Sequence, residues 1–147
     1  MELSKTAKPA LYTIIDANLN RAKEGLRVCE DIARFSAKSA PLSKRLKNIR
    51  HLVSKAAAAA CPDYSVLISN RDSASDVGRR TNIKSEFKRG NIHSVIAANF
   101  KRAQESLRVL EETSKLISPQ AAASFKEARY MCYEAEKIMI TSERKKI

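Results

Sequence analysis

Apolar residues recur every three or four positions in four long segments of the chain, a spacing that is typical of amphipathic helices. In the first segment, Ala22, Leu26 and Cys29 fall on one helical face. Asp16 and Ser118 are residue types that cap helix N-termini, and they precede the first and fourth segments. The predicted helices are residues 16–36, about 41–60, 91–117, and 119 to the C-terminal region.

The first and third predicted helices contain near copies of one segment. Residues 17–30 read ANLNRAKEGLRVCE and residues 98–111 read ANFKRAQESLRVLE, which agree at nine of fourteen positions. Unrelated segments would agree at about one such position, so we infer a duplication. A weaker echo follows in the next helix of each copy, LKNIRH at 46–51 against FKEARY at 125–130. The repeat unit is therefore a helical hairpin.

Two such hairpins predict an all-α fold with four main helices in a pseudo-twofold bundle. The length of 147 residues favours a single domain. Repeat 1 spans about residues 12–60 and repeat 2 about residues 91–143, and residues 61–90 form a long central loop. Residues 64–68 are too short an apolar run to predict a helix there. A connection of this length in a compact domain is either functional or disordered.

Polar side chains interrupt the apolar face of every predicted helix. Each helix places one arginine within its apolar arc, and these are Arg21, Arg50, Arg102 and Arg129. Asn18 and Asn99 stand three residues before the first and third of them. An unpaired charge inside the bundle would be very costly, so an anionic group is expected to meet each arginine.

Two interpretations of these arginines stay open. In the first, Glu24, Glu105 and Glu136 neutralise them in a buried ion network. In the second, the helices enclose a pocket where guanidinium groups bind phosphate oxygens, asparagine amides orient a ring and carboxylates hold Mg²⁺. The duplicated motif would then serve two phosphorylated ligands.

Other positions of the repeat predict packing and surface. Gly25 lies on the inward arc, where glycine in a helix costs about 1 kcal/mol relative to alanine, so a close helix crossing is expected. Arg27 with Glu30, and Arg108 with Glu111, are predicted on the outer side as solvated pairs that add little stability.

The net charge of +12 suits nucleic acid, an anionic membrane surface or phosphorylated small molecules alike. Three cysteines without a C-x-x-C spacing indicate reduced thiols rather than disulfides or a zinc site. The sequence has neither a signal peptide pattern nor about 18 consecutive apolar residues, so we expect a soluble, cytoplasmic protein with no membrane partner.

The central loop contains the segment RDSASDVG at residues 71–78, which combines an arginine, two carboxylates and a glycine. Such a composition is common in turns and carries little weight alone. The sequence has no glycine-rich phosphate-binding motif, so a bound nucleotide would depend on side chains.

Several motifs together resemble a known family. They are DANLNRA at 16–22, EGLRV at 24–28, Arg71-Asp72 with Asp76 and Gly78, Ala98-Asn99 with Arg102 and Glu105, LRVLEE at 107–112, and Arg129-Tyr130. In this order they resemble the helical domain that is fused ahead of thiamine phosphate synthase in some bacteria and also stands alone. The likeness spans about residues 12–136.

The resemblance implies an alternative phosphomethylpyrimidine kinase, which uses ATP and Mg²⁺ to convert hydroxymethylpyrimidine phosphate to its diphosphate in thiamine biosynthesis. Such a kinase needs two anion sites and a divalent metal, which the doubled Asn, Arg and Glu set could provide. The length leaves no room for the synthase barrel, so a free-standing version is expected, with thiamine phosphate synthase as a candidate partner.

The residues expected in the site follow from both lines of argument. Phosphate and substrate binding is assigned to Asn18, Arg21, Arg50, Arg71, Asn99, Arg102 and Arg129. Glu24 and Glu105 are the expected metal ligands. Asp76 is expected to bind the metal or to accept the hydroxymethyl proton.

Two other functions stay open. A non-catalytic domain that passes the pyrimidine phosphate to a separate synthase would use the same arginines without ATP turnover. A basic nucleic-acid-binding helical protein is less favoured, because the repeated arginines are predicted to point inward and tryptophan is absent. The oligomeric state is open, a homo-oligomer included, and so is the choice of which repeat holds the nucleotide.

Overall fold

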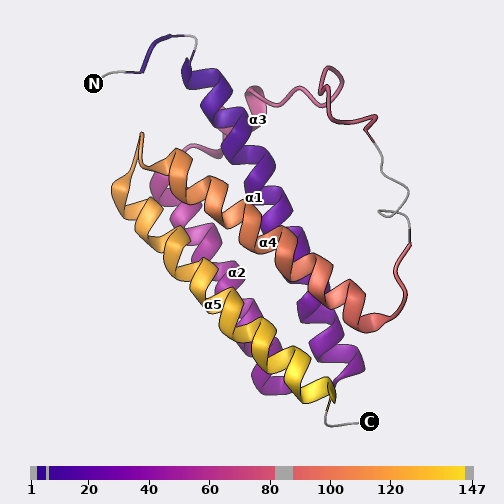
Figure 1. Cartoon of the computed structure of the whole chain (residues 1–147). Coiled ribbons are helices and arrows are strands. Elements are labelled where there is room, and N and C mark those ends of the chain that lie inside the picture. The colour runs from indigo at the N-terminus through magenta and orange to yellow at the C-terminus, as the bar shows by residue number, and fades with distance from the viewer. Residues whose placement is uncertain (1–2, 6, 82–87, 145–147) are drawn as a thin grey trace.

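The computed structural model describes residues 3–5, 7–81 and 88–144. The described residues are helical with no strand, which confirms the all-α prediction. The helices are α1 (Ala7–Asp31), α2 (Ala40–Ala60), α3 (Tyr64–Ser69), α4 (Ile92–Ser114) and α5 (Pro119–Arg144), and a π-helical turn, η1 (Ile32–Ser36), directly follows α1 (Figure 1).

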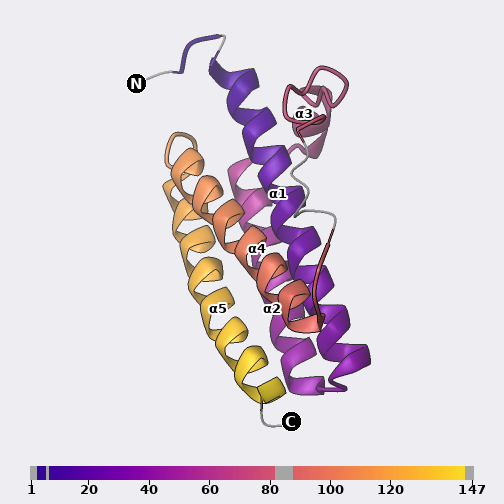
Figure 2. The ribbon, with the colours of Figure 1, turned by 45° about the vertical axis from the view of Figure 1, so that its right-hand side comes forward.

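Four long helices form a bundle in which α1 packs against α2 and α4, and α5 packs against the same two helices. α1 and α4 run in opposite directions, and the start of α1 and the end of α5 lie at opposite ends of the bundle (Figures 1 and 2). Large side chains that are fully buried include Ile15, Leu26, Leu46, Ile49, Phe100, Leu107, Phe125 and Met139. Burying each contributes roughly 1.5–3 kcal/mol. Across the described ranges, every helix is too short or too polar to cross a bilayer.

Side chains cap three of the four long helices. The Ser39 hydroxyl accepts a backbone N–H in the first turn of α2. Asn91 and Ser94 cap the start of α4 reciprocally, each side chain accepting the other's backbone N–H at 3.0 Å. Ser118 accepts the Ala121 N–H at 3.2 Å, as predicted for a residue that caps α5.

Two sequence-based expectations are wrong. α1 begins at Ala7, so Asp16 lies inside the helix and does not cap it. The central loop also contains a helix, α3, because the Asp63 side chain caps its start and Leu67 is buried against the bundle. Local caps and one buried anchor therefore suffice for six residues that were too short to predict as a helix.

The end of the first helical segment has an unusual backbone. The α-helix gives way to the π-helical turn η1, and Lys38 then takes a φ of 50°. The Ser39 N–H donates to the Ala33 carbonyl at 2.9 Å, which closes the helix. This is the position where helices commonly carry glycine, because a side chain disfavours the left-handed conformation.

Candidate functional site

A cleft of about 580 Å³ lies between α1 and α4, beside the central loop. It is lined by Asn18 and Arg21 from α1, by Arg102, Glu105, Ser106 and Val109 from α4, and by Gly78 and Thr81 from the loop. Four of the site residues predicted from sequence, two from each repeat, therefore meet in one cleft. Asn99 and Glu24, which are repeat equivalents of two of these residues, do not line it.

Small residues let the two helices approach closely enough to form this cleft. A Cβ atom on Gly25 would lie 2.7 Å from the Asn99 carbonyl oxygen and 3.5 Å from the Ala103 backbone nitrogen. Ala22 and Ala103 are fully buried. The close crossing predicted from Gly25 is thus confirmed, and its antiparallel geometry brings equivalent residues of the two repeats to the same place.

Arg21 and Arg102 are exposed, so the prediction that they point into the bundle interior is wrong. Both stand at the margin of their apolar arcs, and a long arginine side chain there can extend its guanidinium group into solvent. Within the described residues, neither takes part in an ion pair. The cleft therefore holds two uncompensated guanidinium groups beside one exposed carboxylate, Glu105.

The two repeated asparagines make the same hydrogen bond. Asn18 Nδ2 donates to the Ile14 carbonyl at 2.9 Å, and Asn99 Nδ2 donates to the Val95 carbonyl at 2.8 Å. Each amide nitrogen is thus engaged by its own helix. Asn18 is buried and lines the cleft, and its side-chain oxygen accepts no hydrogen bond within the described residues.

Arg50 and Arg129 are neutralised inside the protein. Arg50 Nε lies 2.6 Å from Glu30 Oε2, and Arg129 Nη2 lies 2.7 Å from Glu111 Oε2. Each pair joins the two helices of one hairpin, α1 to α2 and α4 to α5. These arginines hold the hairpins together, in agreement with an ion network, and stand away from the cleft.

The carboxylates of this network differ from the predicted ones. Glu30 and Glu111 are buried, although they were expected on the outer side. Glu24 and Glu105 are exposed, and Glu136 accepts a hydrogen bond from Gln104 at 2.6 Å. A helical wheel shows which residues share a face, but it does not show which face a second helix covers.

Burial of Glu30 opposes ionisation, but the hydrogen bond and charge of Arg50, with the charges of Arg27 and Lys47, hold its pKa below the ordinary value. The ionised pair is therefore the stable state of this contact.

Arg71 anchors the central loop to α1. Its Nε and Nη2 donate to the two carboxylate oxygens of Asp16 at 2.6 and 2.7 Å. This contact raises the pKa of Arg71. Next to it, the Thr13 hydroxyl donates to the Asn70 carbonyl at 3.0 Å. Arg71, predicted to bind phosphate, is thus already engaged by the buried Asp16, a residue that the sequence argument had assigned to a helix cap.

The loop beyond this anchor holds Asp72 and Asp76. Asp76 Oδ1 accepts the Gly78 N–H at 2.9 Å. Hydrogen bonds from Ser75 lower the pKa of Asp72. Asp76 lines two hollows of about 520 and 360 Å³ that share no lining residue with the cleft, whereas Gly78, two residues on, lines the cleft itself. The loop therefore brings Asp76 to the edge of the cleft rather than into it.

The cleft has a carboxylate that could bind a metal ion together with the phosphate groups of a substrate. The described residues contain no group of three or more His, Cys, Asp or Glu side chains that could hold a metal ion. Glu105 is the carboxylate among the cleft-lining residues. Mg²⁺ is commonly held by one or two carboxylates together with substrate phosphates, and these residues fit that arrangement.

A model of the ThiD2 family matches residues 13–138. The chain belongs to the ThiD2 family. It is 39% identical over 134 residues to a thiamine-phosphate synthase of Nostoc punctiforme, which covers 91% of this chain and 36% of that protein. It is 43% identical over 120 residues to a thiamine-phosphate synthase of Rhodopirellula baltica, covering 82% of this chain and 32% of that protein.

A thiamine-phosphate synthase of Synechocystis sp. is 35% identical over 141 residues, which cover 96% of this chain and 39% of that protein. The chain thus spans well under half the length of these curated relatives. They agree with the resemblance deduced from the motifs. No solved structure matches the chain.

Proposed function

We propose that this chain is a phosphotransferase of thiamine biosynthesis that uses ATP and Mg²⁺ to convert hydroxymethylpyrimidine phosphate to its diphosphate. Membership of the ThiD2 family and the similarity to thiamine-phosphate synthases support the pathway. The observation that carries the reaction is the cleft, where Arg21 and Arg102 lie beside Glu105 without an ion pair to any described residue, next to a loop that carries Asp76.

The work of such a site is positioning and charge neutralisation. Arg21 and Arg102 can each donate two hydrogen bonds to phosphate oxygens, which suits a site that must hold two phosphorylated molecules. Glu105 would hold Mg²⁺ together with those oxygens, and the ion would neutralise charge on the transferring group. Asn18 would orient the pyrimidine ring through its side-chain oxygen.

The chemistry of the monophosphate revises the role expected for Asp76. The hydroxymethyl oxygen of this substrate is already esterified, so the atom that attacks the γ-phosphorus is an oxygen of the substrate phosphate. The new bond joins that oxygen to phosphorus as the bond to the leaving ADP oxygen breaks. An ionised phosphate oxygen has no proton to lose, so Asp76 is not needed as a proton acceptor, and metal binding or loop positioning remains its proposed role.

The direct test is to incubate the protein with ATP, Mg²⁺ and the pyrimidine monophosphate and to follow the diphosphate by phosphorus NMR. The proposal expects diphosphate and ADP in equal amounts, with product lost in the Arg21→Ala/Arg102→Ala double variant. Tight binding of the monophosphate without ATP turnover would overturn it in favour of a carrier that hands the pyrimidine to thiamine phosphate synthase.

A further inference from the structure

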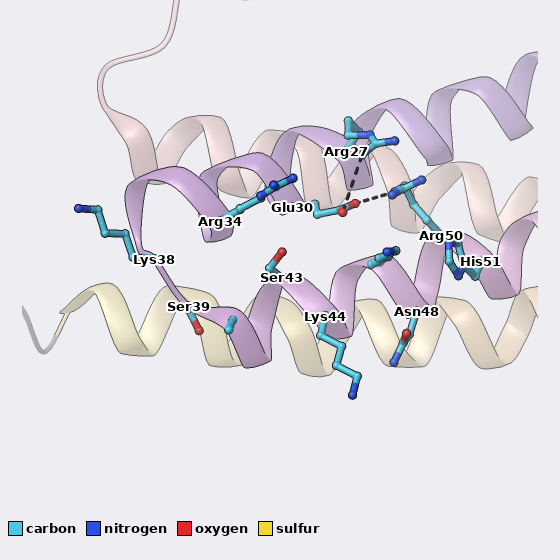
Figure 3. A pocket seen from close by; sticks show the side chains of 12 residues that line it. Arg27, Glu30, Arg34, Lys38, Ser39, Ser43, Lys44, Asn48, Arg50 and His51 are labelled. Carbon is cyan, nitrogen blue, oxygen red and sulfur yellow. Dashed lines mark hydrogen bonds and ion pairs between the residues drawn. The ribbon is translucent and has the colours of Figure 1, made fainter.

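A second basic site lies on another side of α1. It is a hollow of about 1050 Å³ between the end of the first helical segment and α2 (Figure 3), and we call it the basic basin. Six cationic residues line it: Arg27, Arg34, Lys38, Lys44, Lys47 and Arg50. Glu30 is the one carboxylate among its lining residues.

The basic basin is separate from the cleft between α1 and α4. Of the described residues, none lines both. Arg21 of the cleft and Arg27 of the basic basin are six positions apart, which places them about 9 Å apart along the axis of α1 and about 120° apart around it. Ligands of the two sites therefore do not share side chains.

Figure 3 shows how the charges are arranged. Glu30 lies between Arg27 and Arg50, with Arg34 on its other side, and the rim lysines Lys38 and Lys44 are directed outward. Arg50 lies 2.6 Å from Glu30, whereas Arg27 is 3.8 Å away. Glu30 thus lies next to two guanidinium groups and also interacts electrostatically with Lys47. Within the described residues, Arg34, Lys38 and Lys44 form no ion pair.

Repeat 2 can be compared with repeat 1. It contains the equivalent ion pair, Glu111–Arg129, but fewer of its neighbouring cations lack an acidic partner. There Glu112 compensates both neighbouring cations, with its Oε1 3.0 Å from Arg108 and 2.7 Å from Lys115. The Tyr133 hydroxyl accepts a hydrogen bond from Arg129 at 3.2 Å. Holding a hairpin together therefore requires the arginine–glutamate pair, but it does not require the uncompensated cations of repeat 1.

The backbone conformation around the basic basin also favours a functional site. Arg34 lies in the π-helical turn η1, and such turns are frequent at functional sites. Lys38 adopts the left-handed conformation with φ 50°, where glycine would relieve the strain. The wall of the basic basin thus has a lysine at a position where the helix end alone favours glycine.

We propose that the basic basin binds a small ligand with two or more linked phosphate groups. Its cations are spread along the hollow, with Lys38 and Lys44 at the rim, so a single phosphate would leave most of them unpaired, whereas a polyphosphate chain could reach several at once. His51 carries the one aromatic ring among its lining residues, so recognition would depend mainly on charge. A nucleoside triphosphate and a diphosphate ester both carry this chemistry.

The test uses inorganic triphosphate as the probe, in the Arg21→Ala/Arg102→Ala background so that the cleft does not contribute. Calorimetry should show one site, and Arg34→Ala and Lys47→Ala should each weaken binding about two- to fivefold. The matched controls are Lys115→Ala and Lys126→Ala, which remove the same charge at the equivalent positions of repeat 2. These controls should leave the affinity unchanged.

Lys38→Gly separates function from folding, since it should raise the unfolding temperature while it weakens triphosphate binding. Competition with ATP and with the pyrimidine diphosphate identifies the source of the phosphate chain. Equal losses in the repeat 1 and repeat 2 variants, equal affinity for orthophosphate, or tighter binding of duplex DNA would each overturn the proposal. Triphosphate binding is measured without turnover, so the absence of kinase activity would not affect the proposal for the basic basin.

Discussion

Gly25 of α1 faces the backbone of α4 so closely that a Cβ atom at this position would lie 2.7 Å from the Asn99 carbonyl oxygen. This distance is shorter than real Cβ contacts, and the opposing atom belongs to a helix backbone that cannot rotate away. The crossing of α1 and α4, and with it the cleft, therefore depends on a residue without a side chain.

We predict that Gly25→Ala destabilises the protein by about 1–3 kcal/mol, because the added methyl group must push the two helices apart. Alanine would stabilise an isolated helix by about 1 kcal/mol, so the sign of the effect is diagnostic. Urea denaturation measures it. The control is Ser106→Ala at the equivalent position of repeat 2, which should stay within about 1 kcal/mol of the wild type. A Gly25→Ala protein as stable as the wild type would contradict the close crossing.

The cleft arginines should matter for ligand binding and not for folding. We predict that Arg21→Ala and Arg102→Ala each weaken binding of the pyrimidine monophosphate about tenfold, because each removes a charged donor from the cleft. Both are exposed and unpaired within the described residues, so their unfolding free energies should stay within about 0.5 kcal/mol of the wild type. Calorimetric titration measures the affinity for the monophosphate, and urea denaturation measures the free energy of unfolding.

The matched variants for this comparison are Arg27→Ala and Arg108→Ala, which lose the same charge outside the cleft. We expect them to retain near-normal affinity for the monophosphate. If they bound it more weakly than the cleft variants, the assignment of the pyrimidine site to the cleft would be wrong.

How far the sequence predicts this molecule depends on whether a feature is local. The repeated segment and the apolar spacing predicted the bundle, because helices and their buried faces follow from residues three and four positions apart. The contact of Asp16 with Arg71 joins residues 55 positions apart, and no local pattern contains it. The same holds for Arg50, whose burial was predicted but whose partner, Glu30, was expected in solvent.

The Glu30–Arg50 pair should make stability depend on pH. The folded pKa of Glu30 is lowered, so the unfolded state binds protons more readily and the pair stabilises the fold fully above the unfolded value of about 4.3. This contribution is lost as the pH falls through the lower folded pKa. We predict that Glu30→Gln costs about 1–3 kcal/mol at pH 7 and that the difference from wild type shrinks at acid pH.

Urea denaturation from pH 7 down to pH 2.5 measures this difference. The control is Glu24→Gln, which alters an exposed carboxylate of the same helix. A Glu30→Gln protein that lost stability with falling pH as steeply as the wild type would show that other carboxylates govern acid unfolding.

The Asp16–Arg71 contact should hold the central loop against α1. We predict that Asp16→Asn, which keeps the shape and removes the charge, makes the loop several-fold more sensitive to trypsin at Arg79 and Arg80. The fold should survive, because the core helices do not depend on the loop. The control is Asp31→Asn, which alters an exposed aspartate of the same helix. Unchanged cleavage would mean that α3 alone positions the loop.

Asp76 is the carboxylate that the loop carries to the edge of the cleft, and its Oδ1 accepts the Gly78 N–H. An asparagine there keeps an oxygen for this hydrogen bond, so Asp76→Asn removes the charge without opening the turn. In a transfer governed by charge, losing a carboxylate that helps to hold the metal should lower kcat at least tenfold, while monophosphate affinity changes little.

Asp72→Asn is the matched control for Asp76, because Asp72 lies in the same loop, is exposed and binds Ser75 rather than the glycine of the cleft wall. Steady-state kinetics at saturating Mg²⁺ and at limiting Mg²⁺ distinguish the two roles proposed for Asp76. A metal ligand should give a kcat that partly recovers as Mg²⁺ is raised, whereas a residue that only positions the loop should give a kcat that does not respond. An unchanged kcat in Asp76→Asn would remove this residue from the mechanism and leave Glu105 as the carboxylate on which metal binding depends.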